Sequence, residues 1–101
     1  MPCRRIGIPD AFAVLSGPNP PDDVGFRSNR LQILGNSRDT PWSDPDMHMH
    51  TEGDEAYLVL EGSITLLIED ERVRVSEGEV CFVTAGTFHA LIDVTPPYRG
   101  F

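Results

Sequence analysis

The chain has 101 residues, of which 40% are hydrophobic and 24% charged, as expected for one globular domain with a single hydrophobic core. Its formal net charge is −8, with 8 basic residues dispersed among 16 acidic ones, which argues against binding to nucleic acid or to an anionic membrane surface. No apolar run approaches the roughly 20 residues that span a bilayer, and Pro9 and Asp10 interrupt the stretch that would form a signal peptide. A cytoplasmic location is therefore expected.

The first 46 residues contain few clear elements. Residues 11–15, AFAVL, could open a strand or form a turn of helix, and residues 16–23 form a loop by composition. A strand is predicted over 30–34. A second loop, rich in turn-forming residues, is predicted over 36–46 and contains the only tryptophan, Trp42.

The pattern of residues 47–101 predicts short strands separated by turns that are rich in glycine and acidic residues. Strands are expected over 47–50, 55–60, 63–69, 73–75, 80–83 and 89–94, with 55–60 and 63–69 at the spacing of a hairpin. A Pro-Pro pair at 96–97 is expected to follow the last strand as a break. This pattern indicates an all-β fold, a small antiparallel β-barrel or jelly roll.

Three histidines and one glutamate have spacings that suit a metal site. Side chains at i and i+2 of a strand share a face, so His48 and His50 can converge. Glu55 opens the next predicted strand, and His89 can complete the set if the last strand lies beside the first. Each of these residues taken singly is more often an ordinary surface side chain. Together, three imidazoles and one carboxylate suit one divalent transition metal, namely Fe, Mn, Ni, Cu or Zn.

The same residues resemble the two sequence motifs of the cupin superfamily. In the first motif, His48 and His50 are followed by Glu55 after four residues and by Gly62 after six more, although Trp42 replaces the usual opening glycine. Fifteen residues lie between Gly62 and Gly78, where the second motif begins, and two of the usual residues of this motif differ. It comprises Gly78, Thr84 in place of proline, Gly86, His89 and Asp93 in place of asparagine.

This resemblance implies a cupin barrel that holds its metal through His48, His50, Glu55 and His89. It also implies an N-terminal arm and strand over residues 1–24 and the barrel over 25–101, within a single domain overall. Small cupins commonly form homodimers by exchanging or adding N-terminal strands, which here would be residues 11–15 or 31–34.

The expected barrel interior suggests what the domain binds. Tyr57 shares a strand face with Glu55 and is the candidate catalytic hydroxyl. Phe82 and Phe88 are expected inside the barrel and Trp42 at its mouth. No basic residue lies within either motif, and Arg27, Arg30 and Arg99 are expected at the surface. The prediction is a mainly apolar cavity for a small organic molecule.

Several functions remain open at this point. The favoured interpretation is a metal-dependent enzyme of dioxygenase type, with isomerase, lyase or cyclase chemistry as further options. The alternative is a non-catalytic small-molecule-binding or sensing domain. A storage or stress protein with an adventitious metal is a third possibility.

Overall fold

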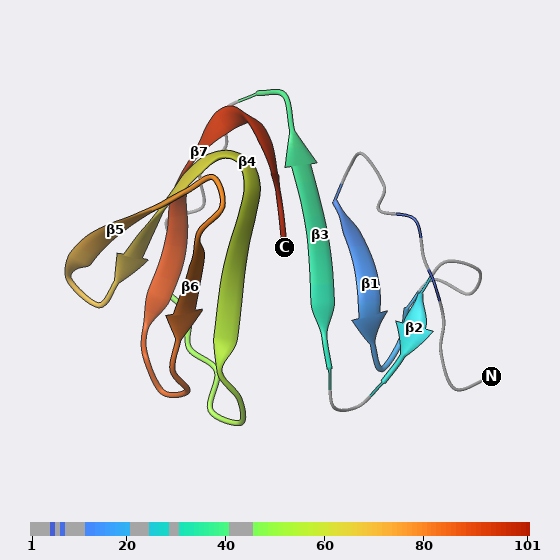
Figure 1. Ribbon diagram of the computed structural model, residues 1–101. Coiled ribbons are helices and arrows are strands. Elements are labelled where there is room, and N and C mark those ends of the chain that lie inside the picture. The colour runs from blue at the N-terminus through green and yellow to red at the C-terminus, as the bar shows by residue number, and fades with distance from the viewer. Residues whose placement is uncertain (1–4, 6, 8–11, 21–24, 29–30, 41–45) are drawn as a thin grey trace.

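The computed structural model describes residues 5, 7, 12–20, 25–28, 31–40 and 46–101, and every regular element within them is a β-strand (Figure 1). None of these residues belongs to a helix long and apolar enough to cross a membrane. The strands are β1 (Ala13–Gly17), β2 (Phe26–Arg27), β3 (Ile33–Arg38), β4 (Glu55–Ile68), β5 (Glu71–Ser76), β6 (Val80–Val83) and β7 (His89–Gly100).

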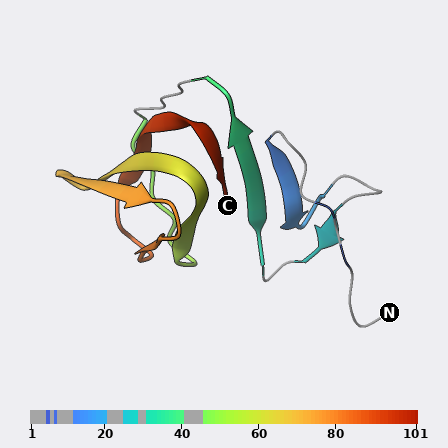
Figure 2. The same cartoon turned by 45° about the horizontal axis from the view of Figure 1, so that its top comes forward.

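The seven strands form one curved sheet with the order β2-β1-β3-β7-β4-β5, and β6 pairs with the first part of β4. All pairs are antiparallel except β1–β2. Strands β4 to β7 wrap around into a rounded unit, whereas β1 to β3 stand to one side of it (Figure 2). Strand β3 joins the two parts because it pairs with β1 on one edge and with β7 on the other. The predicted all-β fold is confirmed.

Strand β4 replaces the hairpin that was predicted between residues 55–60 and 63–69. It runs without interruption over 14 residues and bends where Gly62 adopts a φ of +79°. Before the bend β4 pairs with β6, and after the bend it pairs with β5. The hairpin prediction was wrong because the glycine bends the strand and changes its partner without reversing the chain.

Strand β7 also continues past its predicted end at residue 94. Thr95 pairs with Ser63 and Arg99 pairs with Glu61, with an irregularity in register between them. Pro96 and Pro97 fall within this irregularity, which is the kind of position where a strand tolerates residues without a backbone N–H. Residues 98–100 then pair with β3.

Two further element predictions need correction. Residues 47–50 form a single bridge, between His48 and His89, and no strand. Strand β3 covers 33–38 and not 30–34, so its second half lies where a loop was predicted. That half has no apolar alternation, and its pairing with the far end of β7 is a contact between distant parts of the chain.

The hydrophobic core lies inside the rounded unit. Its buried members are Val59, Ile64, Leu66, Val75, Val94 and Tyr98. The prediction that Phe82 and Phe88 face the interior was wrong, since their side chains are 72% and 51% exposed. Phe82 pairs with Ala56 across the ladder and shares its outward face, while Phe88 directly precedes the buried His89. Trp42 lies outside the described residues.

Candidate metal site

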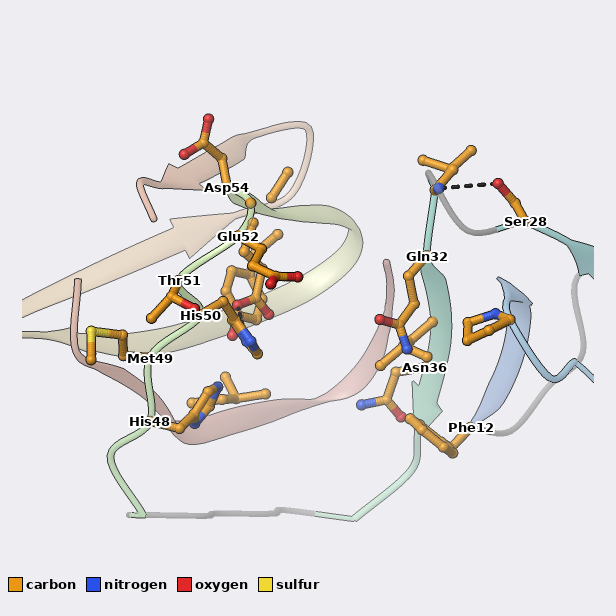
Figure 3. A pocket seen from close by; sticks show the side chains of 18 of the residues that line it. Phe12, Ser28, Gln32, Asn36, His48, Met49, His50, Thr51, Glu52 and Asp54 are labelled. Atoms are coloured by element: carbon orange, nitrogen blue, oxygen red, sulfur yellow. Dashed lines mark hydrogen bonds and ion pairs between the residues drawn. The ribbon is translucent and has the colours of Figure 1, made fainter. Parts of the chain in front are cut away.

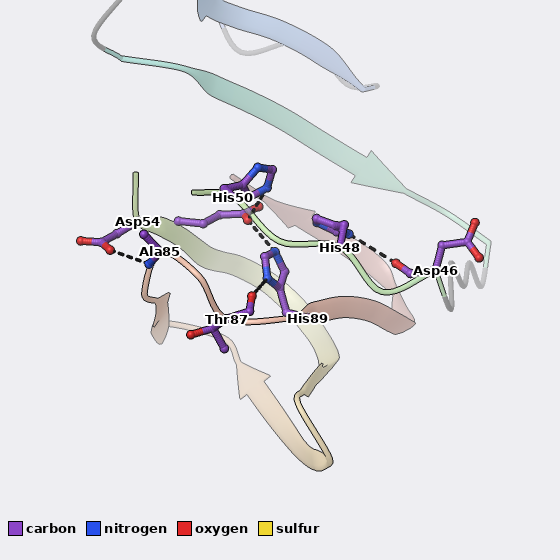
Figure 4. A network of polar contacts seen from close by, with 8 residues as sticks. Asp46, His48, His50, Asp54, Ala85, Thr87 and His89 are labelled. Atoms are coloured by element: carbon purple, nitrogen blue, oxygen red, sulfur yellow. Dashed lines mark hydrogen bonds and ion pairs between the residues drawn. The ribbon is translucent and has the colours of Figure 1, made fainter. Parts of the chain in front are cut away.

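The structure brings together the four side chains that the motifs single out. One nitrogen or oxygen atom from each of His48, His50, Glu55 and His89 lies within 4.8 Å of the other three. Glu55 is at the centre, because its Oε2 atom lies 2.7 Å from Nε2 of His89 and 3.1 Å from Nε2 of His50. Ring centroids of His48 and His89 are 4.2 Å apart. Figure 4 shows the three imidazoles gathered around this point.

Backbone hydrogen bonds hold the two motif segments against each other. His48 and His89 exchange both of their backbone hydrogen bonds, with N···O distances of 2.9 and 2.8 Å. The N–H of Gly86, where φ is +84°, donates to the carbonyl of His50, and the N–H of Ala85 donates to Oδ1 of Asp54. These contacts place His89 beside His48 and His50 even though about 40 residues separate them in sequence.

His89 is the most firmly positioned of the four side chains. Its side chain is buried, and Nδ1 donates to the carbonyl of Thr87 at 2.9 Å, which leaves Nε2 directed at Glu55. Nδ1 of His48 is 3.3 Å from the carbonyl of Asp46. Hydrogen bonds of this kind commonly orient histidines that bind metals, because they fix the tautomer and the ring.

The donor set fits a divalent transition ion. Two donors that bind one ion at about 2.1 Å lie about 3–4 Å apart, close to the two distances around Glu55. His48 and His50 are exposed and Glu55 is half-buried, so the cluster faces solvent on one side. These four residues could therefore hold a metal and leave a coordination position for another molecule.

Comparison with protein families agrees with the motifs. A model of the Cupin domain matches residues 39–96, which is more than half of the chain. The chain belongs to the cupin family. The motif glycines at 62, 78 and 86 all have positive φ values, between +79° and +84°, which explains why glycine occupies these turns of the cupin.

Solved structures share this cupin fold. KdgF from a Halomonas species is 21% identical with a TM-score of 0.52, and the match covers 66% of this chain and 58% of that one. A cupin protein from Bacteroides fragilis is 17% identical with a TM-score of 0.57, covering 68% and 58%. A protein from Thermus thermophilus is 18% identical with a TM-score of 0.54, covering 96% and 88%.

At these identities the likeness establishes the fold and no shared activity. The cupin described here spans less than two thirds of the length of the first two of these structures. A search of curated proteins found no match to its sequence.

Tyr57 lies beside the cluster, on the same face of β4 as Glu55. Its ring centroid is 6.3 Å from that of His89. Burial is the main cause that raises the pKa of Tyr57, and the negative charge of Glu55 and a hydrogen bond to it raise that pKa further. The phenol is therefore neutral at physiological pH and can donate a hydrogen bond to the carboxylate.

A cavity of about 1000 Å³ adjoins the cluster and extends to the N-terminal strands (Figure 3). Tyr57, Leu91 and Tyr98 line it from β4 and β7. The cavity is mainly apolar, as predicted, but the wall across from Tyr57 also carries the polar side chains of Gln32, Asn36 and Arg38. Sequence reasoning missed Asn36 and Arg38 because both were assigned to a loop. The available signal was that these two residues continue the series Gln32 and Leu34 at intervals of two residues, which is the spacing of side chains on one face of a strand.

Proposed function

We propose that this cupin domain is a metal-dependent enzyme that acts on a small organic molecule. The observation that carries the proposal is the convergence of three imidazoles and one carboxylate within 4.8 Å, next to a cavity of about 1000 Å³. A cavity of this volume is large enough for a metabolite-sized ligand. The proposed metal ligands are His48, His50, Glu55 and His89.

Each residue of the site has a proposed role. When bound, a divalent transition ion supplies Lewis acidity and, if it is redox-active, electron transfer to oxygen. His89 holds its position through Thr87, and the exposed His48 and His50 complete the imidazole set. Glu55 serves as a ligand or accepts a proton from the substrate. Tyr57, the proposed catalytic hydroxyl, donates a hydrogen bond toward Glu55 or the substrate.

Dioxygenase-type chemistry is one candidate reaction, and isomerase, lyase or cyclase chemistry is the other. The cavity is mainly apolar but has a polar wall on β3, so its lining does not by itself favour oxidation. The dioxygenase proposal therefore depends chiefly on the donor set. Oxygen uptake after anaerobic loading with Fe(II) separates the two candidates. Binding of a small molecule without any turnover would instead support the alternative function, a sensing or binding domain.

The metal ligands can be tested by substitution. His50→Ala and Glu55→Gln are each expected to lower metal content from about one equivalent per chain to a small fraction of that, because the first removes a donor and the second replaces a carboxylate by a neutral amide. The matched control is Met47→Ala, an exposed residue next to His48 that does not line the cavity. Elemental analysis measures the metal, and circular dichroism checks that the β-sheet is intact. Full metal content in both folded variants would contradict the proposal.

We also propose a homodimer and a cytoplasmic location, as expected from the sequence. Exposed apolar side chains on β4 and β6 support the dimer. Cell fractionation tests the location.

A further inference from the structure

One face of β3 forms the cavity wall across from the candidate metal site. Every second residue of this segment, Gln32, Leu34, Asn36 and Arg38, lines the cavity. Side chains at this spacing share one face of a strand, and the row extends over about 20 Å. Figure 3 shows Gln32 and Asn36 on one side of the cavity and His48 and His50 on the other.

Charge is unevenly distributed around this cavity. Glu52, Asp54 and Glu55 lie together beside the histidines, and Oδ1 of Asp54 accepts a hydrogen bond from Ala85. Among the described residues that line the cavity, Arg38 is the only one with a permanent positive charge. Its guanidinium has five N–H donors in a planar fork, so it can bind a carboxylate and retain a contact within the protein.

Asn36 offers a complementary group on the same wall. Its Oδ1 atom is buried and has no hydrogen-bond partner among the described residues. A buried acceptor without a donor costs free energy, and a hydroxyl of a bound ligand would supply that donor. Because Asn36 and Arg38 are two residues apart on β3, one ligand can reach both.

We propose that Arg38 and Asn36 recognise a hydroxy acid, with the carboxylate on Arg38 and a hydroxyl on Asn36. This inference rests on the proposed function, since other oxygen atoms of the same molecule extend to the metal site. Recognition by a guanidinium fork and an amide selects acids over neutral analogues of the same shape. The two residues are thus specificity determinants and take no part in the proton transfer.

Calorimetric titration of the zinc-loaded protein with tartrate and gluconate, and with the neutral tartramide and gluconamide, tests the inference. The affinity of at least one acid is expected to be higher than that of its amide by about 10-fold or more. Arg38→Gln should remove this preference, and Arg38→Lys should restore part of it. Arg72→Gln, which removes an exposed charge on β5, should change neither affinity. Zinc content is measured before and after each titration, because hydroxy acids chelate metals.

A second variant keeps the test valid if Arg38→Gln does not fold. Asn36→Asp is nearly isosteric and places a negative charge on the same wall, so acid binding should weaken by about 10-fold or more. Asn19→Asp, at an exposed position, is its control. Zinc retention without any preference for acids, or with a preference that neither β3 variant lowers, would overturn this inference alone. Absence of zinc from the unmodified protein would overturn the proposed function instead.

Discussion

At the scale of single residues, Glu55 connects the parts of the site. Its Oε2 atom contacts His50 and His89, and its carboxylate also interacts with Tyr57. A carboxylate surrounded by three polar groups is well placed to bind a metal and to exchange a proton with a ligand. Tyr57 is the member of this group that is least suited to binding a metal, because its neutral phenol is a poor ligand.

Tyr57→Phe separates a catalytic role from packing. The variant keeps the ring and removes the hydroxyl, so we expect unchanged metal content and at least a 10-fold change in ligand affinity or turnover. Elemental analysis and titration with the acids described above provide the two measurements. Thr65→Val, which removes a hydroxyl from β4 at a position that does not line the cavity, is the comparison. Unchanged affinity and turnover in Tyr57→Phe would show that Tyr57 only packs.

At the scale of elements, the bend in β4 shapes the sheet. Strand β4 pairs with β6 before Gly62 and with β5 after it. On its other edge it pairs with β7, and the register of that pairing is irregular. The backbone of β7 comes very close at this point. A Cβ atom on Gly62 would meet the carbonyl of Pro97 and lie 2.8 Å from that of Thr95. Glycine is therefore required both by the positive φ and by the lack of space.

Gly62→Ala should lower the free energy of unfolding by about 1–3 kcal/mol or more, since it adds backbone strain and a clash. Denaturation by urea, followed by circular dichroism, measures this change. Gly53→Ala is the control, because nothing lies within 4 Å of a Cβ atom there. Equal stability of the two variants would show that the bend tolerates a side chain.

At the scale of the whole molecule, one group of exposed apolar residues lies on the paired strands β4 and β6. Leu58 and Val80 are paired across β4 and β6, and they are exposed together with Leu60 and Phe82. Strands β1 to β3 stand to the side of the rounded unit (Figure 1). A second copy of the chain could cover the apolar face with such an extension.

Light scattering coupled to size-exclusion chromatography should therefore report twice the 11.2 kDa mass of one chain. Phe82→Glu should shift the population toward the monomer, because it places a charge on the apolar face. Phe88→Glu is the control at an exposed position outside the paired strands β4 and β6. A monomer at micromolar concentration would contradict the homodimer.

The sequence alone determined the fold class, the family and the four side chains of the candidate site. These features follow from local spacing: alternate residues in strands, glycines at turns with positive φ, and histidines two residues apart. The alternation of Glu55, Tyr57 and Val59 toward the interior was readable for the same reason.

Only the tertiary structure decided the continuous β4, the extension of β7 past its prolines and the polar wall on β3. Each depends on a partner strand that is distant in the chain, and an isolated segment has no local signal for such pairing. Arg38 becomes a cavity residue only because β3 pairs with the end of β7. Local patterns thus specify the donor atoms, whereas strand pairing places the wall that faces them.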